Sequence, residues 1–255
     1  METGNQGDGF EITAPQPLKG EFLLAPPSGA GGGLFAIIVA GGSGTRMQNP
    51  VPKQFIAIGG KPVLMHTLQR FRDFSPDIQI ILVLPESETA AWETLCREHN
   101  FQVQHRTVAG GVTRFVSVRN GLAQIPDNHG LVAIHDGVRP FVPVAVIAAS
   151  FAAATTHGTG IATVACKDSV RQITDTQSVA LDRSRMRLVQ TPQTFRVELL
   201  RQAFENAPHT DFADDASVAE SAGYKIHLVE GSYQNIKITT PEDLLVAQVF
   251  VRAGM

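Results

Sequence analysis

The chain has 255 residues, of which 43% are hydrophobic and 18% are charged, and its formal net charge is −3. This length and composition suit one globular domain with a sizeable hydrophobic core. The small net charge argues against a general nucleic-acid binder or a membrane-surface binder, so any anion site must be a local cluster of basic side chains.

Residues 1–33 are expected to form a disordered leader in front of a folded domain at 34–255. This stretch holds eight glycines and four prolines, and its charges sum to −3. It therefore buries little apolar surface and would lose much conformational entropy on ordering. An apolar island at residues 22–24 is a candidate for docking on the domain.

From residue 34 onward, apolar runs alternate with segments of helical periodicity. Proline suits the first helical position, so Pro62 and Pro143 each mark a helix start. Further helices are expected at 86–99 and 112–124, and strands at 34–39, 78–84, 101–105, 131–135 and 160–166. Because these strands lack polar alternation and helices separate them, the pattern predicts an α/β fold with a mostly parallel sheet covered on both faces.

The pattern changes after Asp168. Apolar and polar residues alternate at 169–173 and 179–181, with a turn at 174–177, which predicts a projecting β-hairpin arm over 169–183. A projecting arm usually packs against a partner, so we expect a homodimer. The remaining elements are expected as strands at 188–190, 225–229 and 235–238, and as helices at 196–206, 214–222 and from Pro241.

Cysteine usage and hydropathy indicate where the protein works. Cys96 and Cys166 are isolated, without CxxC or Cys/His ligand spacing, which favours buried thiols in a reducing compartment. No apolar run reaches the roughly 18 residues that span a bilayer. The first residues lack the charged start and apolar core of a secretory signal. We therefore expect a cytoplasmic protein that does not bind membranes.

The loop after the first strand is the most informative segment. It reads VAGGSGTRMQNPVPKQF over residues 39–55 and holds Gly41, Gly42, Gly44, Arg46 and Lys53. The P-loop pattern fails because no Gly-Lys-Ser/Thr occurs, and the dinucleotide pattern GxGxxG fails at Met47. The pattern that fits is GGxGxRM followed by Pro-Lys. Its glycines let backbone N–H groups approach a polyphosphate, and its two cations supply positive charge.

A carboxylate stands where ligands collect in open α/β sheets. The motif HDGVRP begins at His135, where the fourth predicted strand ends. Asp136 is a hard oxygen ligand that suits Mg²⁺ bound jointly with phosphate oxygens; the structural alternative is a buried, hydrogen-bonded aspartate. His135 is interpreted as a structural histidine, because no second His or Cys is spaced to join it in binding a metal.

Taken in order, the motifs resemble those of a known family. After the glycine loop come GGVTRFVSV at 110–118, HDGVRP at 135–140, TPQ at 191–193 and NIKIT at 235–239. This series resembles the 2-C-methyl-D-erythritol 4-phosphate cytidylyltransferases of non-mevalonate isoprenoid synthesis, from about Phe35 to Val251. Each motif is short, but their order is specific to the cytidylyltransferase group.

The resemblance implies a Rossmann-like nucleotidyltransferase fold of the GT-A kind and transfer of CMP from CTP to the polyol phosphate with Mg²⁺. It implies that Arg46, Lys53 and Lys237 are catalytic and that Asp136 holds the metal. The implied nucleotide contacts are Ala40, Gly41, Gly42, Gly44, Gly110, Gly111 and Ser117. The implied contacts to the second substrate are Arg139, Ser169, Arg183 and Thr191, with Arg183 reaching across a dimer interface.

The chain departs from the family pattern at a few positions. Val112 stands where many relatives carry an acidic residue, Ser169 where threonine is commoner, and Ala213 where a hydroxyl residue is often found. Asp214 has a second interpretation as a helix N-cap, and Arg114 as a surface charge.

Three other functions stay open at this point. Ribitol 5-phosphate cytidylyltransferases share nearly all these motifs, so the acceptor is not fixed. A non-catalytic nucleotide-binding module would keep the glycine loop but could lose Lys53, Asp136 or Lys237, and all three are present. A nicotinamide oxidoreductase is the third alternative, against which Met47 counts.

Overall fold

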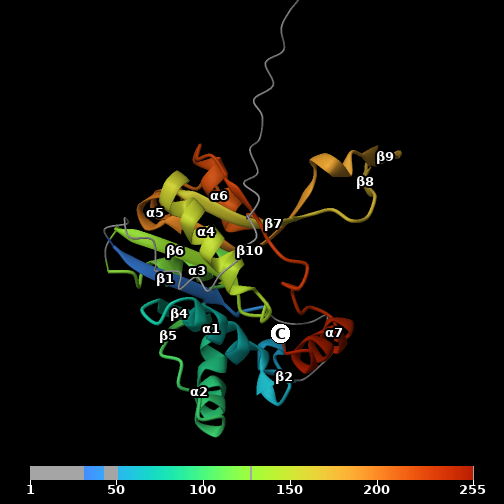
Figure 1. Ribbon diagram of the computed structural model, residues 1–255. Helices are drawn as coiled ribbons and strands as arrows, with labels where there is room; N and C mark the ends of the chain where they lie inside the picture. The colour runs from blue at the N-terminus through green and yellow to red at the C-terminus, as the bar shows by residue number, and fades with distance from the viewer. Residues whose placement is uncertain (1–31, 43–50, 127, 255) are drawn as a thin grey trace, which may run out of the picture.

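The computed structural model describes residues 32–42, 51–126 and 128–254. At its centre is a seven-stranded sheet with the strand order β11-β7-β10-β6-β1-β4-β5 (Figure 1). β10 is antiparallel to both of its neighbours, and every other neighbouring pair is parallel. The strands are β1 (Gly33–Val39), β4 (Gln79–Leu84), β5 (Arg106–Ala109), β6 (Gly130–Asp136), β7 (Thr159–Ala165), β10 (Arg187–Arg196) and β11 (Leu228–Glu230). The predicted α/β fold with a mostly parallel sheet is confirmed.

Helices cover both faces of the sheet. One face packs against α1 (Val63–Phe74), α2 (Thr89–Glu98) and α4 (Val144–His157), and the other against α3 (Arg114–Leu122), α5 (Val197–Glu205) and α6 (Asp215–Ser221). Successive residues of a strand point to opposite faces. In β1, Ala36 and Ile38 therefore join one core, while Phe35 and Ile37 join the other. Burial on both faces explains why the run is apolar without alternation.

A third, smaller core lies beside the main one. It joins the short strand β2 (Ala57–Ile58), which pairs with β3 (Lys61–Pro62), to the last helix, α7 (Pro241–Arg252), through Ile58, Ile238 and Ala247. Thr240 caps α7, and the Asp243 carboxylate accepts a hydrogen bond from the Thr240 N–H at 2.9 Å. The helix expected near Pro241 is thus confirmed. Its packing holds the preceding segment, with Lys237, over the carboxyl end of β6.

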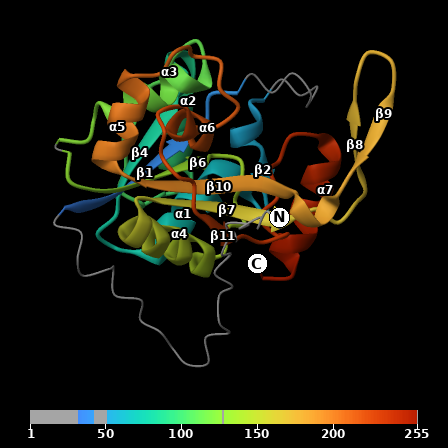
Figure 2. The ribbon, with the colours of Figure 1, turned by 90° about the horizontal axis from the view of Figure 1, so that it is seen from above.

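The predicted arm is also confirmed. Strands β8 (Val170–Ile173) and β9 (Ser178–Leu181) form a sheet of their own, joined by a turn in which the Thr174 N–H donates to the Gln177 carbonyl at 2.9 Å. Figures 1 and 2 show this hairpin standing away from the body of the molecule. Its side chains from residue 171 to 180 are exposed.

Four strand predictions need correction. The strand expected at 101–105 lies at 106–109 instead, because Phe101 and His105 pack on the ring of Trp92, whose indole N–H donates to His105 at 2.9 Å. The strand at 225–229 is reduced to β11, and 235–238 is not a strand. The expected strand at 188–190 is only the start of the ten-residue β10.

Smaller details also differ from expectation. Pro62 and Pro143 are N-cap residues of α1 and α4, one position before the first helical residue. Cys96 and Cys166 are free, as expected, but half-buried, and burial raises the pKa of the Cys96 thiol to about 11. No helix within the described residues is long and apolar enough to cross a membrane. Residues 1–31, on which the leader prediction rests, lie outside the described residues.

Candidate active site

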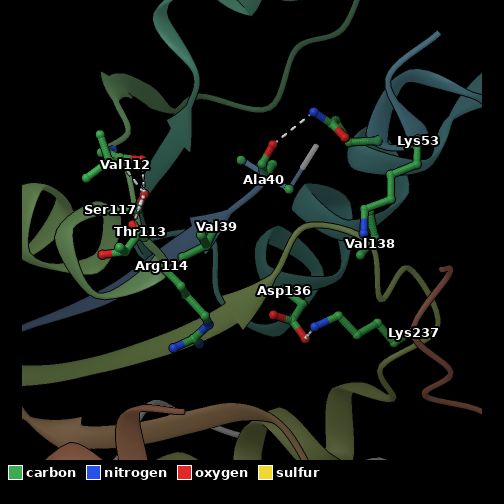
Figure 3. A pocket seen from close by; sticks show the side chains of 14 residues that line it. Val39, Ala40, Lys53, Val112, Thr113, Arg114, Ser117, Asp136, Val138 and Lys237 are labelled. Carbon is green, nitrogen blue, oxygen red and sulfur yellow. Dashed lines mark hydrogen bonds and ion pairs between the residues drawn. The ribbon is translucent and has the colours of Figure 1, made fainter. Parts of the chain in front are cut away.

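A pocket of about 200 Å³ opens at the carboxyl ends of β1 and β6 (Figure 3). Figure 3 shows Lys53, Asp136 and Lys237 on one side of it, with Val112, Thr113 and Ser117 across from them. The segments that form it are the end of β1, the start of the 3-10 helix η2 (Lys53–Phe55), the turn before α3, the end of β6 and the segment before α7. The lining residues are Val39, Ala40, Gly41, Gly42, Lys53, Gln54, Gly111, Val112, Thr113, Arg114, Ser117, Asp136, Val138 and Lys237.

Lys53 is held in place by its neighbour in sequence. The fully buried Gln54 donates its amide hydrogens to the Ala40 carbonyl, at 2.9 Å, and to the Glu88 carboxylate. The first of these bonds ties η2 to the end of β1. A methyl group placed on Gly42 would lie 3.5 Å from the Lys53 ammonium, so a side chain at this position would reach the cation. Of the same loop, Gly44 and Arg46 lie outside the described residues.

The second glycine pair forms a turn that Ser117 closes. The Gly110 N–H donates to the Leu84 carbonyl at 2.7 Å, and the Gly111 N–H donates to the Ser117 hydroxyl at 3.0 Å. That hydroxyl in turn donates to the Thr113 carbonyl at 2.9 Å. A side chain at Gly111 would collide with Val116, at 2.2 Å, so this close approach requires glycine. Ser117 thus shapes the turn that lines the pocket.

Asp136 ends β6 and lies between two cations. Its Oδ2 contacts the Lys237 ammonium at 3.2 Å and the Nε of Arg139 at 3.0 Å. Burial by itself would raise the pKa of this carboxyl group, but the charges of Lys237 and Arg139 outweigh it and hold the pKa well below its usual value. Asp136 is therefore ionised throughout the physiological range of pH.

The groups around Asp136 close a ring of hydrogen bonds. Arg139 Nη1 donates to the Asn235 carbonyl at 2.8 Å, and the Asn235 amide donates to the Thr191 carbonyl at 2.7 Å. The Thr191 hydroxyl then accepts from the Asp136 N–H at 3.0 Å and bonds to His135 at 3.0 Å. Burial lowers the pKa of His135 to about 4, so its imidazole is neutral at physiological pH. This agrees with the interpretation of His135 as a structural histidine.

Arg114 lies at the pocket as the partly exposed half of an ion pair whose carboxylate is buried. Its guanidinium contacts the buried Asp215 carboxylate at 2.6 Å. Burial opposes the charge of Arg114, but Asp215 outweighs this effect, and the pKa of Arg114 lies above its ordinary value. The surface-charge interpretation of Arg114 is wrong. The N-cap interpretation of Asp214 is confirmed, because its carboxylate accepts from the Ser217 N–H at 2.9 Å.

The predicted contacts to the second substrate are not gathered at the pocket. Arg139 and Thr191 lie beneath Asp136 and are engaged in the ring of hydrogen bonds described above. Ser169 and Arg183 are exposed at the root of the arm, where Arg183 donates to the Lys167 carbonyl. Within one chain the structure therefore gives a compact pocket and places these two arm residues outside its lining.

Two residues that support the site were missed in the sequence, and a third was misinterpreted. Gln54 and Asn235 were visible only as neighbours of Lys53 and Lys237 in the motifs PKQ and NIKIT. Both are fully buried amides, which must find hydrogen-bond partners, and this is the signal that marks them in the structure. The third, Arg114, pairs with a carboxylate 101 positions away, which no local pattern reveals.

The arrangement can hold an anionic nucleotide and stabilise charge on phosphates. It offers two glycine turns, two lysine ammonium groups and one ionised carboxylate within a single pocket. The described residues hold no group of three or more His, Cys, Asp or Glu side chains that could bind a metal by themselves. A cation at Asp136 would therefore need oxygens from the substrate, as Mg²⁺ commonly takes from nucleotides.

Comparison with known proteins agrees with this geometry. A family model described as 2-C-methyl-D-erythritol 4-phosphate cytidylyltransferase matches residues 34–253. A protein of that name from Bacteroides thetaiotaomicron is 50% identical over 215 residues, covering 84% of this chain and 98% of the relative. Another from Bacteroides fragilis is 49% identical over 216 residues, covering 85% of this chain and 98% of the relative.

Solved structures give the same result. The 4-diphosphocytidyl-2C-methyl-D-erythritol synthase of Anaerococcus prevotii has a TM-score of 0.75 at 30% identity, covering 86% of this chain and 96% of its own. The 2-C-methyl-D-erythritol 4-phosphate cytidylyltransferase of Thermus thermophilus has a TM-score of 0.71 at 30% identity, covering 86% and 99%. The similarity therefore extends over nearly the whole length of these proteins.

Proposed function

The chain belongs to the 2-C-methyl-D-erythritol 4-phosphate cytidylyltransferase family, and from this membership we propose how its pocket carries the reaction. The enzyme transfers CMP from CTP to 2-C-methyl-D-erythritol 4-phosphate, giving 4-diphosphocytidyl-2-C-methyl-D-erythritol and pyrophosphate in isoprenoid precursor synthesis. Family membership selects this acceptor over ribitol 5-phosphate, and an enzyme over a non-catalytic nucleotide-binding module.

The reaction needs charge stabilisation more than it needs a protein nucleophile. A phosphate oxygen of the acceptor forms a bond to the α-phosphorus of CTP, and the bond from that phosphorus to the bridging oxygen breaks. Pyrophosphate leaves with the electron pair. Because both reactants are anions, positioning and preorganised positive charge lower the barrier. We assign this role to Arg46, Lys53 and Lys237; the support for the lysines is that both line the pocket.

The glycine turns hold the nucleotide in this proposal. Backbone N–H groups at Gly41, Gly42 and Gly44 face the triphosphate, since turns without side chains let phosphate oxygens approach closely. The cytosine and ribose lie at Gly110, Gly111 and Ser117, with Ala40 below them. What supports this placement is that Gly42 and Lys53 line the same pocket and that the Ser117 bond fixes the second turn.

Asp136 is the group that would hold Mg²⁺. Both of its cationic partners contact the same oxygen, Oδ2, so the other oxygen, Oδ1, is the one proposed for the metal. One ionised carboxylate together with phosphate oxygens and waters is a common Mg²⁺ environment in nucleotide-binding proteins. The ion would neutralise charge on the phosphates of CTP, while Arg139 and Lys237 fix the carboxylate that holds it.

The acceptor is proposed to bind at Arg139, Ser169, Arg183 and Thr191 in a homodimer. Ser169 and Arg183 flank the two strands of the arm in sequence, and neither lines the pocket of its own chain. Figure 2 shows the arm projecting from the body of the molecule. The arm also exposes apolar side chains, with Ile173 75% exposed, and a second copy of the chain would cover such a surface. The arm would then bring both residues to the pocket of the partner subunit, in a cytoplasmic enzyme.

The observation that carries the proposal is that Lys53, Asp136 and Lys237 line one pocket together with two glycine turns. The test is pyrophosphate release from CTP and Mg²⁺ with 2-C-methyl-D-erythritol 4-phosphate, with ribitol 5-phosphate in a parallel reaction. Release should require the methylerythritol acceptor and should fall at least a hundredfold in Lys237→Ala. A preference for ribitol 5-phosphate, or full turnover in that variant, would contradict the assignment.

A further inference from the structure

We propose that His135 is a positioning residue for the metal-holding carboxylate, acting on Asp136 through the Thr191 hydroxyl. The inference rests on the role proposed above for Asp136. His135 is fully buried and does not line the pocket, so it touches neither substrate directly. Its two ring nitrogens instead bridge Thr191 and the Arg139 carbonyl, at 3.0 and 3.2 Å.

The need for such a residue comes from the pairing of β6 and β10. The antiparallel ladder pairs Gln193 with Ile134 and continues from there away from the site. Two positions further toward the site, the same register would place Thr191 opposite Asp136. β10 is irregular there, since its register against β7 shifts between Val189 and Gln193.

At this point the ladder is replaced by side-chain hydrogen bonds. The carbonyl of Thr191 accepts from the Asn235 amide at 2.7 Å. The Asp136 N–H, which sheet pairing would have satisfied, donates to the Thr191 hydroxyl at 3.0 Å instead. A buried N–H needs an acceptor, and a single hydroxyl that can rotate supplies it here. The direction of that hydroxyl therefore decides how firmly the last residue of β6 is held.

His135 fixes the direction of that hydroxyl. The Thr191 oxygen accepts from the Asp136 N–H, so its own proton points to Nδ1 of His135, which accepts it. In the neutral ring the remaining proton is then on Nε2, which donates to the Arg139 carbonyl. The Phe71 ring packs against the imidazole in an edge-to-face arrangement, with 5.0 Å between the ring centroids, and limits its rotation.

The two hydrogen bonds of His135 lead to the same carboxylate, that of Asp136. One end holds the backbone of Asp136, and the other holds the backbone of Arg139, whose guanidinium contacts the Asp136 Oδ2 at 3.0 Å. A metal ligand held by a hydrogen-bonded partner binds its ion more tightly than an unsupported one, typically by a factor of 10 to 100. We expect loss of the His135 bonds to weaken the contribution of Mg²⁺ to CTP binding, not CTP binding as a whole.

The two nitrogens can be tested separately. In His135→Asn the amide oxygen replaces Nδ1 and can still accept from Thr191, whereas in His135→Gln the amide group replaces Nε2 and reaches the Arg139 carbonyl only. The measurement is the CTP dissociation constant by calorimetry, with and without Mg²⁺ and without any acceptor. The ratio used here is the dissociation constant without Mg²⁺ divided by the dissociation constant with Mg²⁺. It reports the contribution of the metal alone and does not depend on turnover.

We expect His135→Gln to reduce this ratio about tenfold and His135→Asn to reduce it by no more than about threefold. Thr191→Val, which keeps the shape but removes the hydroxyl, should match His135→Gln. The double variant should show no further loss, because both changes break one pathway. His66→Gln is the matched control: this histidine also bonds to a main-chain carbonyl, that of Ile58, but it does not line the pocket and takes no part in the hydrogen bonds described around Asp136. It should keep the wild-type ratio.

Each contrary result has a distinct meaning. A folded His135→Gln with the wild-type ratio would overturn the positioning role, and equal losses in the Asn and Gln variants would overturn the Thr191 route. If His135→Gln does not fold, Thr191→Val decides alone, and an unchanged ratio in that variant rejects the inference. If Mg²⁺ leaves CTP affinity unchanged in the wild type, the metal role of Asp136 fails and this inference fails with it.

Discussion

The floor of the pocket and the arm carry similar polar side chains in opposite surroundings. Around Asp136, an arginine, a threonine and an asparagine are buried or nearly so, and each bonds to another member of the group. On the arm, Ser169 and Arg183 are exposed, and the hairpin forms a sheet separate from the main one. A buried polar group must be satisfied within its own chain, whereas an exposed one is available to another molecule. The contrast supports a nucleotide half complete in one chain and an acceptor half completed by a second.

The largest effect should come from removing a cation at the pocket. Lys53→Ala should lower kcat about 10²- to 10³-fold, or roughly 3 to 4 kcal/mol, by analogy with the loss of one donor that stabilises a developing oxyanion. The physical reason is that charge builds on the phosphates in the transition state beside this ammonium group. Steady-state kinetics with saturating CTP and acceptor would measure the effect.

The control for this change is another lysine of the same chain. Lys225 is exposed and is not among the residues that line the pocket, so Lys225→Ala should leave kcat within a factor of about two. Normal turnover in Lys53→Ala would show that the pocket is not where charge is stabilised. The contrast drawn between the pocket and the arm would then fail.

Lowering the pH should affect the free energy of unfolding through the buried groups around Asp136 and not through the exposed groups of the arm. His135 in the folded chain has a pKa of about 4 against an ordinary value of 6.5. Between these values the unfolded chain binds a proton that the folded chain does not, so the free energy of unfolding decreases as pH falls. The loss over this window is about 3 kcal/mol at roughly 1.4 kcal/mol per pH unit. Denaturant unfolding at several pH values measures this loss. Between pH 6.5 and 4, the free energy of unfolding of His135→Phe should fall by about 3 kcal/mol less than that of the wild type.

The carboxylates give the reference for this measurement. The depressed pKa of Asp136 means that its contribution is present above about pH 4 and is lost only below that, outside the His135 window. Asp182 lies exposed at the base of the arm, where hydrogen bonds from Ser184 lower its pKa. Asp182→Asn should therefore leave the dependence between pH 6.5 and 4 unchanged. An equal slope in wild type and His135→Phe would contradict the buried neutral histidine.

The sheet was predictable where burial on both faces imposed a simple composition. The strands at β1, β4, β6 and β7 are apolar runs, and the sequence located each of them to within one residue at either end. β10 was mostly hidden because its buried positions include polar residues such as Gln190, Gln193 and Thr194. The strand at 101–105 was misplaced because Phe101 is apolar for another reason, its packing on Trp92. Composition records burial, but not which neighbour causes it.

The site was predictable to the extent that its chemistry is local. The glycine turns, Lys53, Asp136 and Lys237 stand in short motifs, and all the described ones except Gly110 line one pocket. The ring that supports Asp136 was not predictable, because Thr191 and Asn235 lie 55 and more positions away along the chain. Such pairs depend on how strands end in space, as at the irregular end of β10.

The arm should show its effect on the acceptor alone. Arg183→Ala should raise KM for 2-C-methyl-D-erythritol 4-phosphate roughly 10- to 100-fold, the usual range for losing a hydrogen bond to a charged group, and leave KM for CTP unchanged. Co-expression with Lys53→Ala sharpens the test. If the arm serves the pocket of the partner subunit, about a quarter of all sites regain both residues, following from the symmetry of a two-fold dimer. No recovery in the mixture would place Arg183 at the pocket of its own chain.

The smallest effect is expected at the rim of the pocket, where the chain exposes an apolar side chain. Val112 lines the pocket and is 97% exposed, so replacing it should change the stability of the fold by no more than about 0.5 kcal/mol. In Val112→Asp the carboxylate can accept a hydrogen bond from a ribose hydroxyl of CTP. One such bond should lower KM for CTP about two- to fivefold, or roughly 0.5 to 1 kcal/mol, with kcat unchanged.

The substrate supplies the control for Val112→Asp. With 2′,3′-dideoxy-CTP no ribose hydroxyl remains to donate, so the gain in KM should vanish, and Val112→Asn should show a smaller gain than Val112→Asp with CTP. A gain that persists with the dideoxy nucleotide would mean that the new charge acts through the metal or the lysines instead. The ribose would then lie away from the turn at Gly110 and Gly111, and the orientation proposed for the nucleotide in this pocket would have to be reversed.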